Sequence, residues 1–211
     1  MKLAVIMTMY RRHEKTLPLL DRVLNSTKAP DELWIMCEDE DDVFVAEEAL
    51  RELGRDDIKP ILCETPRDGE RYALIPYSNK INYALDRTEA DAIVYVDNGS
   101  MPSERKFEVM LQALVDNPDW GAVYCTQQRT GYREEVHVAH GIVPNGHGLL
   151  NYTQVMHRPT TVRWTTDMRH ANPDLADAIF WQDLGGPFYP VDGATIHDVH
   201  HMNSAAAEGV I

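Results

Sequence analysis

Apolar segments of strand length alternate with segments of helical periodicity over the first half of the chain. Strands that alternate with helices form βαβ units, and near-continuous apolar strands are typical of a parallel sheet covered on both faces. The pattern therefore predicts an α/β fold with a mostly parallel central sheet flanked by helices. The expected strands are Lys2–Met9, Glu32–Cys37, Ile58–Leu62, Asp91–Asp97 and Gly121–Cys125. The expected helices are Glu14–Asn25, Val43–Leu53, Ser78–Arg87 and Ser103–Val115, the last with Ser103 as its N-cap.

The regular alternation fades after Thr126, and the second half of the chain is harder to divide into elements. A length of 211 residues suits one domain, and no repeat or linker marks a boundary within it. We therefore expect a single domain over residues 1–211, with a small irregular C-terminal portion. Its expected elements are a strand within Glu135–Val143, a loop at 144–148, a helix at Asp174–Leu184 and short strands at 188–192 and 194–199.

Polar side chains follow three of the predicted strands at the points where those strands end. Thr8 and Tyr10 follow the first strand, Glu38 and Asp39 follow the second, and Asp97 ends the fourth. Ligands of open parallel sheets bind beyond the carboxyl ends of the strands. These side chains are therefore expected to converge on one binding site.

The charge of the chain excludes several classes of partner. Lys and Arg total 20 against 34 Asp and Glu, which gives a formal net charge of −14. This balance argues against nonspecific binding to nucleic acid and against docking on anionic lipid. No stretch of about 18 apolar residues predicts a membrane span. The three cysteines form no paired motif, which favours reduced thiols and a cytoplasmic protein. The sequence carries no indication of the oligomeric state.

Asp97 is the first candidate for metal chemistry. It ends a buried strand and is followed by Asn98-Gly99-Ser100, which predicts a tight exposed turn. Mg²⁺ and Mn²⁺ prefer oxygen ligands and are often held by one or two carboxylates together with substrate phosphates. The alternative is an Asp-Asn-Gly turn that only ends the strand.

Four segments in order resemble motifs of the family 2 glycosyltransferases. The segments are Ile6–Arg12, which is an apolar strand ending in Thr-x-Tyr-Arg-Arg, Trp34–Asp39, which ends in paired acids, Asn82–Leu85, and Ala92–Asp97. The resemblance covers roughly residues 3–118. It implies the Rossmann-like GT-A fold, with a nucleotide-sugar-binding half at residues 1–125 and an acceptor-side half at 126–211.

The resemblance also implies a set of residues for the donor site. Thr8 and Tyr10 would line the nucleotide site, Glu38 would contact the base or ribose, and Asp97 would belong to the Asp-x-Asp signature that binds Mn²⁺ or Mg²⁺. The sequence departs from that signature because Asp97-Asn98-Gly99 has no second Asp. The remaining donor-site candidates are Arg11, Asn82 and Asn98, and the candidate cations for the diphosphate are Arg11, Arg12, Lys80 and Arg158.

Two histidines near the C-terminus are candidates to complete the metal site. His197 and His201 would face the same way on an alternating strand, and imidazole is a good ligand for Mn²⁺. A solvated histidine-rich strand end is the alternative.

The catalytic base is expected on the predicted helix at 174–184, where Ala176–Leu184 resembles the Glu-Asp helix of the family. Asp177 is favoured, with Asp183 as the competitor; the alternative for Asp177 is a first-turn carboxylate stabilised by the helix dipole.

The residues together with the resemblance predict a metal-dependent glycosyltransferase that moves a sugar from a UDP-sugar to the hydroxyl of an unidentified acceptor, such as a protein or glycan. The inverting outcome is implied by the resemblance alone. Two alternatives stay open. A sugar nucleotidyltransferase would usually carry a glycine-rich loop after the first strand, and Thr8–Arg12 has no glycine. A catalytically inactive scaffold of the same fold is favoured by the missing second Asp.

Overall fold

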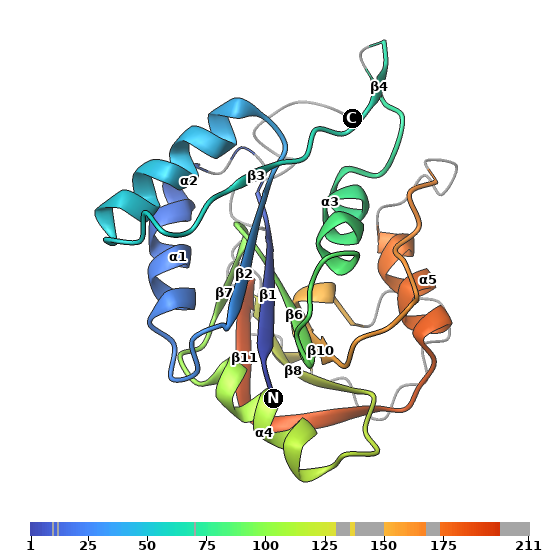
Figure 1. Cartoon of the computed structure of the whole chain (residues 1–211). Helices are drawn as coiled ribbons and strands as arrows, with labels where there is room; N and C mark the ends of the chain where they lie inside the picture. Colours follow the sequence, from blue (N-terminus) through green and yellow to red (C-terminus); the bar gives the residue numbers. More distant parts are fainter. Residues whose placement is uncertain are drawn as a thin grey trace.

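The computed structural model describes residues 1–9, 11, 13–69, 71–129, 136–137, 150–167 and 174–198. The helices are α1 (Thr16–Leu24), α2 (Glu40–Glu52), α3 (Pro76–Leu85), α4 (Lys106–Asp116) and α5 (Asp174–Leu184), with 3-10 turns η1 (His13–Lys15) and η2 (Tyr152–Gln154). The strands are β1 (Leu3–Thr8), β2 (Glu32–Cys37), β3 (Ile61–Leu62), β4 (Arg67–Asp68), β5 (Arg71–Tyr72), β6 (Ala92–Asp97), β7 (Ser100–Pro102), β8 (Ala122–Arg129), β9 (Val136–His137), β10 (Val155–His157) and β11 (Phe188–Asp198). Figure 1 shows their arrangement.

One sheet organises the described part of the chain. Its order is β3-β2-β1-β6-β10-β8-β11-β7, and β9 pairs with β8 beside this path. β3, β2, β1, β6, β8 and β11 run in one direction, whereas β10, β7 and β9 run against it. The predicted mostly parallel α/β architecture is therefore confirmed. β4 and β5 form a separate hairpin.

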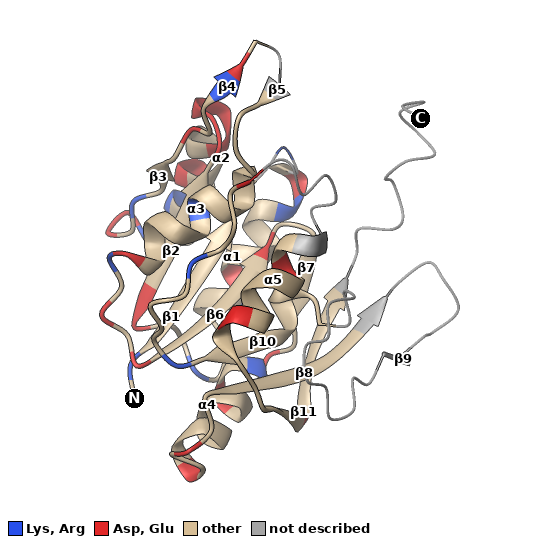
Figure 2. Cartoon of the chain, turned by 90° about the vertical axis from the view of Figure 1, so that its right-hand side faces the viewer, with Lys and Arg blue, Asp and Glu red and all other residues tan. Residues whose placement is uncertain are grey.

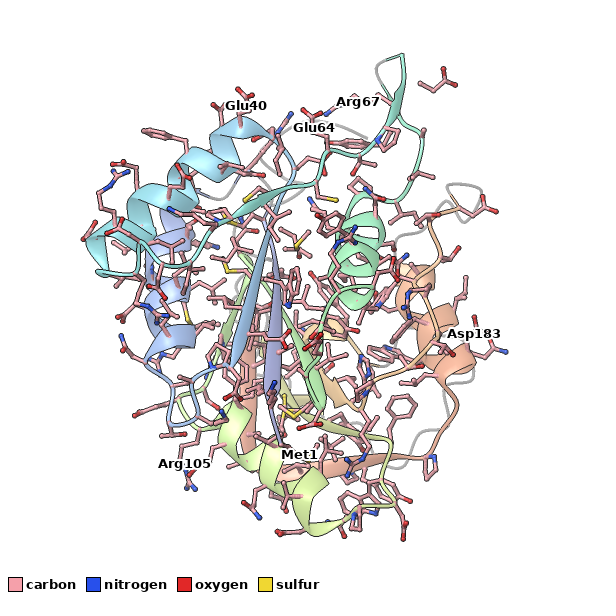
Figure 3. All side chains as sticks on the ribbon, viewed as in Figure 1. Met1, Glu40, Glu64, Arg67, Arg105 and Asp183 are labelled. Carbon is pink, nitrogen blue, oxygen red and sulfur yellow. The ribbon has the colours of Figure 1, made fainter. Side chains whose placement is uncertain are left out.

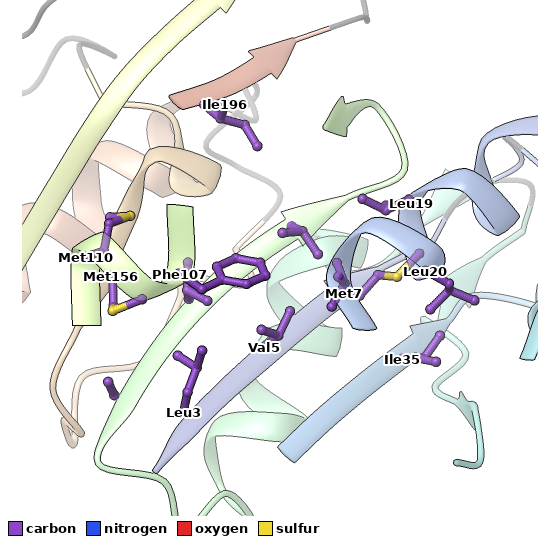
Figure 4. Close-up of a cluster of buried hydrophobic side chains, with 14 of the residues drawn as sticks. Leu3, Val5, Met7, Leu19, Leu20, Ile35, Phe107, Met110, Met156 and Ile196 are labelled. Atoms are coloured by element: carbon purple, nitrogen blue, oxygen red, sulfur yellow. The ribbon is translucent and has the colours of Figure 1, made fainter. Parts of the chain in front are cut away.

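Helices cover both faces of the sheet, as the apolar strands require. Leu3, Val5 and Met7 of β1 pack toward α1, α2 and α4 on one face, and Figure 4 shows this cluster. Ala4 and Ile6 pack toward α3 and α5 on the other. No helix in the described ranges is long and apolar enough to cross a membrane.

Helices α1, α2, α3 and α4 all begin at other residues than the sequence predicts, and the difference is largest for α2 and α4. α2 starts at Glu40 rather than Val43, because the Asp39 side chain accepts the Asp42 backbone N–H and caps the first turn. α4 starts at Lys106, and Ser103 is not its N-cap. The Ser103 hydroxyl instead accepts the backbone N–H of Thr195 and joins α4 to β11.

The C-terminal strands also differ from the prediction. The expected pair at 188–192 and 194–199 is a single strand, β11, whose pairing with β8 shifts register between Pro190 and Thr195. β10 is not predicted by the sequence because three residues are too few to show a period, yet it lies between β6 and β8. Of the strand expected within 135–143, β9 is described, and the loop at 144–148 lies outside the described residues.

His157 of β10 is buried with its ring nitrogens in fixed roles. The Nδ1 donates to the Arg158 carbonyl at 2.7 Å, so the Nε2 accepts the Tyr95 hydroxyl at 2.6 Å. Burial lowers the pKa of His157 to about 4, because a proton on Nε2 would add charge inside the core. Burial also raises the pKa of the Tyr95 phenol. The folded chain therefore keeps His157 neutral.

We predict that folding stability falls as the pH decreases from about 6.5 toward 4. The unfolded chain binds a proton at an ordinary His pKa of about 6.5, whereas the folded chain does not until about pH 4. Between pH 7 and about pH 5 this difference removes about 2 kcal/mol from the free energy of unfolding. Denaturant titrations of the wild type and His157→Gln measure it, and equal pH slopes for the two would contradict the assignment.

Candidate functional site

The pairing of parallel strands brings distant polar residues to one edge of the sheet. Thr8 lies opposite Asp97 because β1 and β6 are paired in register to their last residues. β10 runs against β6, so the η2 turn before it lies at this same edge. The predicted convergence at the carboxyl ends is thus observed for Thr8 and Asp97, and η2 joins them.

Tyr152 of η2 connects the two carboxylates that the sequence predicts as functional. Its hydroxyl donates to Oδ2 of Asp97 at 2.7 Å, and its backbone N–H donates to Oδ2 of Asp177 at 2.9 Å. The Thr8 hydroxyl lies 3.4 Å from the Tyr152 oxygen. Burial, followed by the nearby Asp97 carboxylate, raises the pKa of the Tyr152 phenol well above its ordinary value. Tyr152 therefore remains a hydrogen-bond donor at neutral pH.

The structure separates the two candidate bases on α5. Asp177 is 9% exposed and faces the edge of the sheet through its bond from Tyr152. Asp183 is exposed on the outer side of α5, where Figure 3 shows it pointing away from the sheet. Asp177 is thus the one that belongs to the same network as Asp97.

Glu38, at the end of β2, is held by groups of the protein itself. Its carboxylate accepts the backbone N–H of Thr65 at 3.0 Å, the Thr65 hydroxyl at 2.9 Å and the Lys80 ammonium at 3.0 Å. Lys80 also donates to the Met9 carbonyl at 3.1 Å. Glu38 and Lys80 therefore form a buried ion pair that ties α3 to the ends of β1 and β2.

A cavity of about 420 Å³ opens beside this ion pair. It is lined by Glu38, Asp39, Glu64, Thr65, Pro66 and Arg67. Glu64 and Arg67 lie at the end of the molecule opposite Met1, as Figure 3 shows. The cavity thus lies at the carboxyl end of β2, where the sequence predicts nucleotide binding.

The loop after β1 is anchored by a buried carboxylate of α2. Asp42 accepts the Arg11 backbone N–H at 3.2 Å, the His13 Nε2 at 3.0 Å and the Glu38 backbone N–H at 3.2 Å. Arg11 has a backbone φ of 52°, which lies in the left-handed region that residues other than glycine rarely adopt. Asp42 therefore holds Arg11 in a strained turn at the predicted donor site. Tyr10, the neighbouring donor-site candidate, lies outside the described residues.

Asn82 makes two bonds with the backbone of one residue. Its amide N–H₂ donates to the Trp164 carbonyl, and its amide oxygen accepts the Trp164 N–H, both at 2.8 Å. Trp164 packs in the core between α3 and α5. Asn82 therefore clamps the segment after β10 onto α3, and its predicted role in donor binding stays a prediction.

Arg158 lies away from the candidate site. Its guanidinium donates to the carbonyl oxygens of Leu114 and Trp120, around the C-terminal end of α4. It also approaches the Met1 sulfur, at the opposite end of the sheet from Asp97. The sequence offers Arg158 as a cation for the diphosphate, and its position contradicts that interpretation. It stabilises the end of α4.

The residues around Asp97 fit a cation that is shared with a substrate. Oδ1 of Asp97 accepts the Gly99 N–H at 2.8 Å, which forms the predicted tight turn, but this turn is buried and not exposed as the sequence predicts. Asn98 in this turn is buried, and the Ser100 hydroxyl beyond it is buried with no hydrogen-bond partner among the described residues. Each carboxylate oxygen has two lone pairs, so Asp97 can bind a cation while it keeps its bonds to Gly99 and Tyr152. One carboxylate suits Mg²⁺ or Mn²⁺ that is held mainly by phosphates.

The histidines predicted as further metal ligands are described only in part. His197 lies on β11 in register with Met101 of β7, close to the turn that follows Asp97. His201 lies outside the described residues. Within the described ranges, no three His, Cys, Asp or Glu side chains form a metal-binding group. Metal binding therefore stays a prediction.

Two residues of the site are not among the predicted ones, although the sequence carries a signal for each. Lys106 is fully buried and donates to the Thr153 carbonyl of η2. It lies on the buried face of α4 with Met110 and Leu114, at spacings of four residues. A lysine at that position indicates a buried cation. For Tyr152, the preceding Asn151 forms a capping box with Gln154, a pattern that predicts a helical turn.

Comparison with known proteins gave structural matches alone. The sequence matched no protein-family description and no curated protein. A crystal structure of S. aureus TarS 1-349 aligns with a TM-score of 0.69 at 12% identity, over 94% of this chain and 60% of that one. The same TarS fragment in complex with UDP-GlcNAc aligns at 0.66 with 14% identity, over 97% and 61%. Its complex with UDP aligns at 0.67 with 13% identity, over 93% and 60%.

This likeness confirms the fold that the sequence predicts. The chain has a GT-A-like α/β fold, with a central sheet flanked by helices on both faces. It spans about three fifths of the TarS fragment to which it is similar.

We predict that Asn82→Ala reduces the free energy of unfolding by about 2 kcal/mol, because the N–H and C=O of Trp164 both lose their partner. Asn82→Asp keeps the acceptor and should lose less. Denaturant titration measures both variants. A fully stable Asn82→Ala would contradict the clamp, and a loss of UDP affinity in a folded variant would support the donor-site role.

Proposed function

We propose that this chain is a glycosyltransferase related to family 2, which transfers a sugar from a UDP-sugar to an acceptor hydroxyl with inversion. The observation that carries the proposal is the linked pair of carboxylates at the carboxyl edge of the sheet. Asp97 and Asp177 come from strand β6 and helix α5, and Tyr152 joins them by two hydrogen bonds. A similar fold was solved with UDP-GlcNAc.

The cavity beside β2 is the proposed nucleotide site. It lies next to the end of β1, since Lys80 connects Glu38 to the Met9 carbonyl. A volume of about 420 Å³ suits a small polar ligand. Arg11 follows β1, which pairs with β2 on one side and with β6 on the other, and the proposed diphosphate would extend across the end of β1.

The two carboxylates have separate roles in the proposed reaction. Asp177 accepts the proton of the acceptor hydroxyl as that oxygen attacks the sugar carbon. Asp97, with the Ser100 hydroxyl and the predicted His197 and His201, would hold a divalent cation against the donor diphosphate. When bound, such a cation would supply charge neutralisation for the leaving diphosphate. A protein and a glycan are the proposed classes of acceptor.

One observation favours the second candidate function, an inactive scaffold of the same fold. The turn after Asp97 supplies Asn98 and Gly99 where a second carboxylate would support metal binding. A sugar nucleotidyltransferase is less favoured, since the loop that starts at Thr8 lacks glycine.

We predict that the chain hydrolyses UDP-sugars slowly in the presence of Mn²⁺ and is stabilised by UDP with Mn²⁺ in thermal-shift assays. Asp177→Asn should lower the hydrolysis rate by at least about 100-fold, since it removes the proton acceptor. Asp97→Ala should abolish the stabilisation by UDP with Mn²⁺.

Asp183→Asn is the matched control, because Asp183 lies exposed on the same helix as Asp177. It should behave as the wild type in both assays. Stabilisation by UDP without hydrolysis of any UDP-sugar would favour the scaffold. Preferential stabilisation by CTP would favour the nucleotidyltransferase, and a wild type that responds to neither nucleotide would contradict the proposed function.

A further inference from the structure

We propose that Tyr152 is a positioning residue that sets the donor-side and acceptor-side carboxylates of the site relative to each other. The inference rests on the proposed function, because it assigns Asp97 to the donor and Asp177 to the acceptor. It adds a residue that acts through its hydrogen bonds to both carboxylates.

The geometry uses the two ends of one residue. The phenol oxygen of Tyr152 donates to Asp97 at 2.7 Å, and its backbone N–H donates to Asp177 at 2.9 Å. The rigid ring lies between the two donors, so the separation of the carboxylates is set by the length of one tyrosine. A phenol attached to a fixed backbone has two side-chain torsions, which leaves few ways for this separation to vary.

Tyr152 itself is held from several sides. Its ring stacks on Tyr77 with centroids 5.8 Å apart and meets the edge of Trp164 at the same distance. The Tyr77 hydroxyl makes a long contact of 3.5 Å with Oδ1 of Asp177. Tyr152 therefore packs against Tyr77, which also contacts Asp177, one of the two carboxylates that Tyr152 joins.

The backbone of η2 is fixed by its own cap and by a buried cation. Asn151 accepts the Thr153 N–H, and the Gln154 side chain returns to the Asn151 N–H in a capping box. Lys106 of α4 donates to the Thr153 carbonyl. A fully buried lysine is costly to maintain, so a role in holding this turn accounts for its position.

Removing the phenol oxygen of Tyr152 tests its bond to Asp97 independently of its backbone bond to Asp177. Tyr152→Phe loses the bond to Asp97 and keeps the N–H that holds Asp177. A hydrogen bond to a charged group accounts for about a tenfold change in affinity. We expect UDP with Mn²⁺ to bind about tenfold more weakly by calorimetry, and KM for the UDP-sugar to rise by a similar factor. The kcat for hydrolysis should stay within about threefold of the wild type.

Tyr189→Phe is the matched control, because Tyr189 stacks on Trp120 and pairs with Val123 near the start of β8, away from the site. It should leave UDP affinity, KM and kcat unchanged. A purely structural role for Tyr152 would lower the melting temperature and reduce kcat without a selective rise in KM, and this result would overturn the inference.

Lys106→Met replaces Tyr152→Phe if the latter does not fold. It keeps an unbranched side chain, shorter by the terminal amine, and removes the bond to Thr153. Burial disfavours the ammonium, but Lys106→Met also leaves the Thr153 carbonyl without its donor, so we expect a modest change in the melting temperature while UDP affinity falls several-fold. Unchanged affinity in a stable Lys106→Met would then overturn the inference.

The failure of this inference differs from failure of the proposed function. A wild type that binds UDP and hydrolyses a UDP-sugar, with unchanged UDP affinity in a folded Tyr152→Phe, overturns the role of Tyr152 alone. A wild type that does not bind UDP with Mn²⁺ overturns the proposed function and this inference together.

Discussion

The parallel pairing of β1 with β2 and β6 is the constraint on which the rest of the site depends. β1 is buried along its whole length, so its register with both neighbours is set by packing on the two faces. That register brings Thr8 level with Asp97 and leaves the ends of all three strands at one edge. A shift by one residue would turn these side chains to the opposite face.

Strand β10, in the second half of the chain, completes this edge because it runs antiparallel to its neighbours β6 and β8. β10 is short and antiparallel, and its start places η2 beside the end of β6. Helix α5 packs through Phe180 and Trp181 on the face of the sheet that α3 also covers. There it presents Asp177 to the η2 backbone. The short η2 turn thereby contacts both the end of β6, at Asp97, and helix α5, at Asp177.

The sequence predicts the fold well and the site in part. Burial on both faces gives β1, β2 and β6 continuous apolar runs, and the predicted bounds of these strands lie within one residue of the observed ones. The partners of Asn82 and Glu38 depend on segments 82 and 27 residues away, which no local pattern shows. Residues within roughly four positions of each other can be paired from a period, whereas contacts across the sheet need its topology.

The buried pairing of Glu38 with Lys80 has an electrostatic consequence for the whole molecule. Acidic side chains gather along α2 (Figure 2), and the formal charge of the chain is −14. These acidic side chains repel an anion that approaches the carboxyl edge of the sheet. Lys80 cancels the charge of Glu38 at the end of that path, so the innermost wall of the cavity is neutral. The other charged residues that line the cavity are Asp39, Glu64 and Arg67. Salt that screens the outer field should therefore hasten the entry of the proposed anionic donor.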